Sequence, residues 1–396
     1  MTSTRTMLRT RSEHAPSRVT SIELFFDLVF VFAVTQLSHL LLAHLDILGA
    51  MQTALLLMAV WWVWIYTSWV TNWLDPDKTP VRLLLFGLML LGLTLAASIP
   101  KAFETRALAF AGAYVVMQVG RSLFMLWALR GRSEVNFRNF QRITAWLMLS
   151  GVFWIAGALI DGNARLGIWA VAMLIEFVSP SLGFWVPGLG RSTTADWDVE
   201  GGHMAERCGL FIIIALDESI LVTGATYADL FWSGETVAAF VTAFVGSVAM
   251  WWIYFNVGAE RASHLIRASA DPGRMARVAY TYVHLLLVAG IIVSAAADEL
   301  VLKHPHGHAD AKTTAVLIGG PALYLIGNLL FKWVTAGWPP LSHLAGLALL
   351  VALVAAADHV PVLALGAAAS LILVVVAAWE TISLQLERAA GSEHGG

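Results

Sequence analysis

The chain has 396 residues, of which 58% are hydrophobic and only 13% are charged. This composition excludes a water-soluble domain of ordinary make-up, and the net charge of −3 with no dense basic tract gives no support for nucleic-acid binding. The single cysteine, Cys208, excludes an intramolecular disulfide and a Cys-rich metal or iron–sulfur site. The apolar residues recur instead in blocks of about 18–25, the length that crosses the hydrocarbon core of a bilayer. The sequence therefore predicts an all-α, polytopic transmembrane helical bundle.

Twelve apolar blocks are predicted to cross the membrane as helices. They cover residues 20–43, 50–73, 81–99, 107–129, 139–160, 166–186, 205–227, 235–258, 276–300, 313–335, 341–357 and 361–385. Most of the 24 Lys and Arg residues fall on the side of the membrane that holds the N-terminus. The positive-inside rule therefore places both ends in the cytoplasm, with residues 1–19 and 387–396 as tails.

Short stretches of the first half of the chain recur in the second half. Trp64-Ile-Tyr66 has a counterpart in Trp252-Ile-Tyr254, and Glu176 has a counterpart in Glu380. We therefore expect two tandem six-helix repeats of the same orientation, residues 20–190 and 191–386. Secondary transporters built from such repeats bind their substrates between the two halves.

The first apolar block carries two carboxylates near its start. Glu23 and Asp27 are four residues apart and share one face of a helix, whereas Gln36 lies deeper on a different face. Thr20 or Ser21 can cap this helix, which offers Glu23 a structural role near the positive end of the helix dipole. Asp27 lies among phenylalanines, where an unpaired charge is costly. Glu23, Asp27 and Gln36 are candidates for a binding site or a gate.

The seventh apolar block and the residues just before it carry five ionisable residues, His203, Glu206, Arg207, Asp217 and Glu218. At about 100° per residue all five fall on one stripe, roughly a third of the helix circumference. Asp217 and Glu218 lie roughly 16 Å or more deeper than His203 and Glu206. Two adjacent carboxylates at such depth disfavour ionising together, so at least one is expected to exchange a proton. We predict a proton or cation site at Glu218, with Asp217 as its neighbour.

Other polar groups carry weaker predictions. Glu176 and Arg121 lie inside apolar blocks and either bind a ligand or pair with a neighbouring helix. His304, His306 and His308 form an external loop that either binds a transition metal or is simply hydrated. No phosphate-binding loop, Ser-His-Asp order or HExxH motif is present, so we expect no cofactor and assign no catalytic or metal-binding residues.

Two motifs stand out when they are considered together. The first is Glu23-Leu-Phe-Phe-Asp-Leu-Val-Phe-Val-Phe-Ala-Val-Thr-Gln-Leu, and the second is His203-Met-Ala-Glu-Arg-Cys-Gly-Leu-Phe-Ile-Ile-Ile-Ala-Leu-Asp-Glu-Ser. They resemble the bacterial low temperature requirement protein A family, and the likeness extends over nearly the whole chain. This resemblance implies an integral membrane protein with many helices but no particular chemistry, since the family name records a cold-growth phenotype. The family pattern has a glycine where this chain has Asp217, which favours Glu218 as the functional carboxylate.

Three functional hypotheses follow. In the first, the protein is an ion-coupled transporter in which Glu218 and Asp217 bind a proton or cation, while a cytoplasmic gate is formed by Glu23, Asp27, His203, Glu206 and Arg207. In the second, it is an intramembrane enzyme that acts on a lipid or hydrophobic small molecule through His203 and the carboxylates. In the third, it is a structural or sensory protein whose charges only pair with each other. The expected partners are the lipid bilayer and a small solute or proton, and the sequence leaves a homo-oligomer open.

Overall fold

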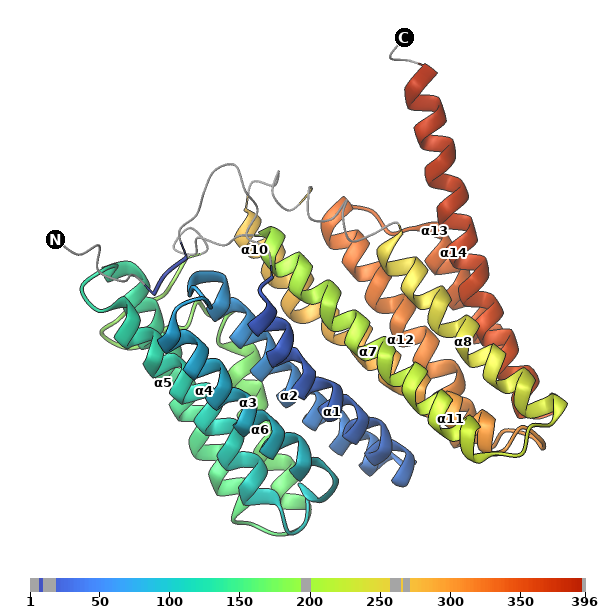
Figure 1. Ribbon diagram of the computed structural model, residues 1–396, viewed down its shortest axis with the longest axis horizontal. Coiled ribbons are helices and arrows are strands. Elements are labelled where there is room, and N and C mark those ends of the chain that lie inside the picture. Colours follow the sequence, from blue (N-terminus) through green and yellow to red (C-terminus); the bar gives the residue numbers. More distant parts are fainter. Residues whose placement is uncertain (1–6, 10–18, 194–200, 257–264, 266–270, 394–396) are drawn as a thin grey trace. The chain divides into compact units, whose positions relative to one another are not determined.

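The structure is a computed structural model that describes residues 7–9, 19–193, 201–256, 265 and 271–393. The described chain is almost entirely helical (Figure 1), and it divides into two compact units, residues 1–207 and 208–396. Unit 1 contains α1 (Ser21–Ala43), α2 (Ile47–Trp73), α3 (Thr79–Ser98), α4 (Ala107–Leu129), α5 (Glu134–Ala158), α6 (Asn163–Val178) and the start of α7 (Gly201–Asp229). Unit 2 contains the rest of α7, α8 (Gly234–Phe255), α10 (Pro272–Ala276), a π-helical segment (Arg277–Val283), α11 (His284–Lys303), α12 (Ala311–Ala336), α13 (Leu341–Val354) and α14 (Val362–Glu393).

Each of the predicted spans overlaps a helix among the described residues, but not every one of these helices has the length and apolarity of a membrane span. Within the described residues, nine helical stretches reach that standard. The helices α6 and α13 have only 16 and 14 residues, and α5 begins with a polar stretch that lowers its hydropathy. Helix length and apolarity therefore support a multi-pass membrane protein, but they do not establish twelve complete crossings.

The exposed face of α1 is apolar and its buried face holds carboxylates, which is the reverse of a helix in a water-soluble protein. On α1, Phe25 and Leu28 are half exposed, whereas Phe26 and Asp27 are buried. α1 packs on α2 and α3, α4 packs on α3 and α5, and α2 also contacts α4 and α6. Because lipid tails solvate Phe and Leu but not carboxylates, this arrangement suits a helix that faces hydrocarbon on one side and protein on the other.

Close packing in unit 2 depends on glycines between α11 and α12. A Cβ atom added at Gly290 would lie 2.4 Å from the backbone nitrogen of Tyr324, and one at Gly320 would lie 2.7 Å from the backbone nitrogen of Ser294. Small residues allow membrane helices to approach each other to backbone contact. The α11–α12 pair therefore forms a close-packed part of this unit.

The chain ends depart from the simple tails that were expected. In the N-terminal tail, the amide N–H of Arg9 donates to Trp73 O at 2.8 Å, and the amide N–H of Asp75 donates to Met7 O at 2.7 Å. Residues 7–9 are thus fixed to the end of α2, while residues 1–6 and 10–18 lie outside the described residues. At the other end, α14 continues to Glu393 and takes up most of the segment that was expected to be a tail.

Candidate functional site

The start of α1 places two buried carboxylates one helical turn apart. Glu23 and Asp27 are each 1% exposed, and their four-residue spacing puts them on the face of α1 that points into unit 1. Thr20 is the N-cap, and both its backbone N–H and its hydroxyl donate to Glu23 Oε2 at 2.9 Å. The capping role expected for Glu23 is therefore confirmed, and it fixes the carboxylate at the first turn.

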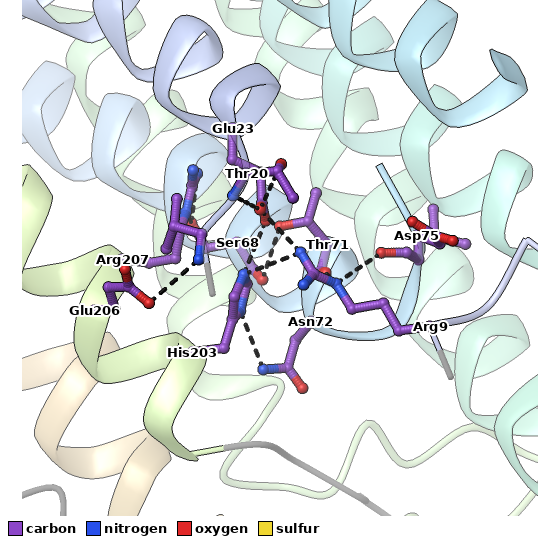
Figure 2. A network of polar contacts seen from close by, with 12 residues as sticks. Arg9, Thr20, Glu23, Ser68, Thr71, Asn72, Asp75, His203, Glu206 and Arg207 are labelled. Atoms are coloured by element: carbon purple, nitrogen blue, oxygen red, sulfur yellow. Dashed lines mark hydrogen bonds and ion pairs between the residues drawn. The ribbon is translucent and has the colours of Figure 1, made fainter. Parts of the chain in front are cut away.

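Glu23 is also the centre of a buried charge cluster (Figure 2). Arg9 Nη2 donates to Glu23 Oε2 at 2.9 Å, and His203 Nε2 lies 2.9 Å from Glu23 Oε1. The other imidazole nitrogen, His203 Nδ1, lies 3.3 Å from Asn72 Nδ2. An amide nitrogen only donates, so this contact favours the neutral tautomer in which His203 Nε2–H donates to Glu23. Both oxygens of Glu23 and both ring nitrogens of His203 therefore have partners.

One turn further along both helices lies a second ion pair. Arg207 Nη2 donates to Asp27 Oδ1 at 2.9 Å, and the Trp64 indole N–H donates to the same oxygen at 2.8 Å. Arg207 also contacts Ser68 Oγ at 3.2 Å and lies over the Trp64 ring, 5.5 Å from its centroid. His203 and Arg207 follow the same four-residue spacing as Glu23 and Asp27, so the two pairs form a ladder between α1 and the first turns of α7.

The second ion pair is incompletely satisfied. Among the residues that the structure describes, neither Asp27 Oδ2 nor Arg207 Nη1 has a hydrogen-bond partner, although both atoms are buried. A buried ion pair normally requires its remaining polar atoms to be hydrogen-bonded in order to offset desolvation. Asp27 Oδ2 can therefore bind a proton, and Arg207 Nη1 can donate to a further acceptor. We call this the open Asp27–Arg207 pair.

The helix α2 supplies partners that were not predicted from the sequence. Trp64, Ser68 and Asn72 are spaced by four residues and contact Asp27, Arg207 and His203. Trp and Ser are ordinary residues in membrane helices. Only the i, i+4, i+8 spacing of Trp64, Ser68 and Asn72 on one face of α2 could therefore have indicated the site. The contact of Arg9 with Glu23 was not predicted either, because Arg9 lies in the N-terminal tail, where the sequence indicated only a general excess of positive charge.

Glu176 and Arg121 lie in a separate network of unit 1 that is fully hydrogen-bonded. Glu176 Oε2 accepts from Tyr114 at 2.7 Å and from Gln118 Nε2 at 2.9 Å, and Glu176 Oε1 accepts from Trp154 at 3.0 Å and from Ser150. In addition, the guanidinium of Arg121 donates to Gln118 Oε1, so Gln118 bridges the charges of Arg121 and Glu176. A carboxylate held by four donors is well suited to a structural role.

Arg121 is anchored to α2 as well. Its Nη1 donates to Val63 O at 3.1 Å and to Thr67 Oγ1 at 2.9 Å, and its guanidinium lies 5.5 Å from the centroid of the Tyr66 ring. Thr67 and Ser68 are adjacent in the chain and serve the two networks, so α2 separates the Glu176 network from the Asp27–Arg207 pair.

The remaining predicted residues differ in burial. On α7, Glu218 is buried and Asp217 is half-buried, whereas Glu206 is exposed and accepts a hydrogen bond of 3.2 Å from the amide N–H of Val19. Gln36 on α1 is half-buried. The buried face of α7 is therefore narrower than the predicted stripe, because the edge that carries Glu206 and Asp217 is not covered.

The histidine loop between α11 and α12 was considered as a metal site. His304, His306 and His308 are all exposed. In the part of the chain that the structure describes, no group of three or more His, Cys, Asp or Glu side chains has an arrangement that could hold a metal ion.

The fold and the site together define a multi-pass helical membrane protein with buried ion pairs between its spans. Comparison with known proteins identifies the family. The family model of the bacterial low temperature requirement A protein (LtrA) matches residues 18–378, and the chain belongs to this family. It is also similar to an uncharacterized protein of Rhizobium meliloti (strain 1021), with 42% identity over 370 residues that cover 93% of this chain and 90% of the relative. No solved structure matches the chain.

Proposed function

We propose that this protein is a proton-coupled transporter of a small solute, and that Asp27 is a carboxylate that exchanges the coupling proton. The observation that carries this proposal is the open Asp27–Arg207 pair, in which Asp27 Oδ2 and Arg207 Nη1 lack partners among the described residues. Ionisable residues inside membrane spans are costly to bury and commonly mark ion or substrate pathways.

The comparison with Glu176 distinguishes this pair from a structural one. Glu176 lies at similar burial in the same unit, yet each of its oxygens accepts two hydrogen bonds. Asp27 Oδ1 accepts two hydrogen bonds, whereas Asp27 Oδ2 has none within the described part of the chain. Unit 1 can therefore satisfy a buried carboxylate completely, and it leaves Asp27 with one free acceptor.

Protonation at Asp27 Oδ2 would change the charge balance of the ladder. The neutral carboxyl would hold Arg207 only weakly, and Glu23, one turn away on α1, would become the nearest ionised carboxylate. A proton therefore has a different binding free energy in states with different Arg207 partners, which is the requirement for coupling a proton to a conformational change. In this proposal Glu23, His203, Glu206 and Arg207 gate the cytoplasmic side, and Glu218 with Asp217 supplies a deeper carboxylate pair on α7.

Reconstituted proton transport tests the proposal. Vesicles loaded with a pH-sensitive dye are challenged with mixtures of amino acids, sugars, organic acids and inorganic ions, and the change in internal pH that follows each addition is recorded. We expect at least one mixture to drive proton movement in the unaltered protein. Asp27→Asn and Glu218→Gln should each abolish it, because an amide cannot release a proton at neutral pH.

A matched control separates coupling from loss of a negative charge. Glu134 is largely exposed at the start of α5, so Glu134→Gln removes one carboxylate without touching the buried pair and should leave proton movement unchanged. Absence of solute-driven proton movement with every mixture would count against transport. Normal coupling in Asp27→Asn would count against the assignment of Asp27.

A further inference from the structure

Unit 2 also contains a buried carboxylate, Glu380, that lies between a lysine and a histidine. Lys332 Nζ on α12 donates to Glu380 Oε2 on α14 at 2.5 Å. On the other side, His343 Nδ1 on α13 lies 3.3 Å from Glu380 Oε1 and 3.1 Å from Ser342 Oγ. The side chain of His343 is 0% exposed and that of Glu380 is 7% exposed, so water does not screen this cluster well.

The cluster has the same chemical plan as the Glu23 cluster of unit 1. In each unit, one carboxylate oxygen holds a fixed cation, Arg9 or Lys332, and the other oxygen faces an imidazole, His203 or His343. The two clusters differ at the second ring nitrogen. Whereas His203 Nδ1 faces the Asn72 amide, His343 Nε2 is buried and has no partner among the described residues.

This geometry makes His343 Nε2 the atom at which a proton can be added. In the neutral tautomer with the hydrogen on Nδ1, His343 donates to Ser342 Oγ, which itself donates to Glu380 Oε1 at 3.4 Å, and His343 Nε2 keeps an unshared electron pair. The imidazolium would attract Glu380 Oε1, which lies 3.3 Å from Nδ1, because both partners would then carry charge.

The same surroundings keep His343 neutral while Lys332 remains in place. Burial disfavours the imidazolium. Lys332 disfavours it as well, because its ammonium carries a like charge and already forms an ion pair with Glu380. His343 is also in the first turn of α13, where the helix dipole disfavours a cation. Among the described residues, Tyr324 is a further titratable group near Glu380, and its hydroxyl donates to Met250 O. One carboxylate therefore faces two groups that compete for it as cations.

We propose that His343 is a second proton-binding site, in unit 2, and that protonation of its Nε2 transfers Glu380 from Lys332 to His343. The ligand is a proton, and the released lysine ammonium is the group that moves. The role of this exchange in coupling rests on the proposed transport function, whereas the proton-binding step itself does not.

Nuclear magnetic resonance of the full-length protein in micelles, labelled with ¹⁵N-histidine, tests this step directly. The signal of His343 is identified as the one that disappears in His343→Gln. In the unaltered protein we expect a neutral imidazole at pH 7. In Lys332→Gln, which removes the competing charge and keeps a hydrogen-bond donor for Glu380, we expect the imidazolium to become the major form at the same pH. Adding Glu380→Gln to that variant should return His343 to the neutral form.

A neutral His343 in Lys332→Gln at pH 6 would overturn the proposal. A titration of the unaltered protein with ¹⁵N-lysine gives a second test that does not depend on whether the variants fold. The Lys332 signal should shift at the same midpoint as the His343 signal, and independent midpoints would also overturn the exchange. Because neither measurement requires solute flux, a protonated His343 in a protein that moves no solute would contradict transport and leave the proton site standing.

Discussion

The Asp27–Arg207 pair allows the energetic reasoning to be tested without knowledge of the transported solute. Asp27→Asn keeps the shape of the side chain and removes its charge, which leaves the guanidinium of Arg207 buried without a counter-ion. Arg207→Met leaves Asp27 with the Trp64 N–H as its only remaining partner among those described. The double variant Asp27→Asn with Arg207→Met contains neither charge.

The expected magnitude follows from the geometry. At the observed 2.9 Å between Arg207 Nη2 and Asp27 Oδ1, the Coulomb attraction is about 6 kcal/mol at an effective dielectric constant of about 20. Desolvation of both ions offsets much of this attraction, so the intact pair adds little net stability. Removal of one partner retains the desolvation cost of the other, and each single variant should lose about 3–5 kcal/mol in the free energy of unfolding. The double variant should lose less than either single variant.

Unfolding in mixed micelles with increasing denaturing detergent provides the measurement. The 17 tryptophans supply a strong fluorescence signal, and the three variants with the unaltered protein complete a double-mutant cycle. If the loss in the double variant equals the sum of the two single losses, the two residues are not coupled and the pair does not behave as a buried ion pair. If Asp27→Asn alone costs less than about 1 kcal/mol, the site is hydrated and the argument from burial is wrong.

Two further expectations concern the helices of unit 2. The pKa of Asp310 lies below its usual value because its carboxylate accepts hydrogen bonds from Thr313 at the start of α12. Its contribution should therefore be present above the unfolded-state pKa of about 4 and be lost as the pH falls further. Asp310→Asn should remove this pH dependence and keep the cap, and Asp310→Ala should cost about 1 kcal/mol; hydrogen exchange of the first turn of α12 would report both, and equal acid sensitivity in Asp310→Asn would refute the assignment. In the same helix, Gly320→Ala should destabilise unit 2 by about 1–3 kcal/mol through overpacking against Ser294. Its neighbour Gly319, which has open space at the Cβ position, is the matched control, and Gly319→Ala should cost nothing or gain up to about 1 kcal/mol in a detergent unfolding assay.

Local spacing in the sequence was sufficient to group residues on a helix face. The i, i+4 relation of Glu23 and Asp27 predicted a shared face, and both side chains do point into unit 1. For α7 the same reasoning grouped Glu206 with Arg207, but Glu206 is exposed and Arg207 is fully buried. Helical periodicity gives the angle between two side chains, whereas the covered part of the circumference depends on which helices pack there.

Composition and periodicity by themselves determined that this protein is a helical membrane protein, because a bilayer accepts long apolar helices and rejects unpaired polar backbone. They also located the charges that such a protein must bury. Which charges meet was decided only by the tertiary structure. Glu23 meets His203 and Asp27 meets Arg207 across about 180 residues of chain, by helix packing that no local pattern encodes. The difference between the satisfied Glu176 and the open Asp27 is likewise tertiary, because it depends on how many donors the neighbouring helices bring to each carboxylate.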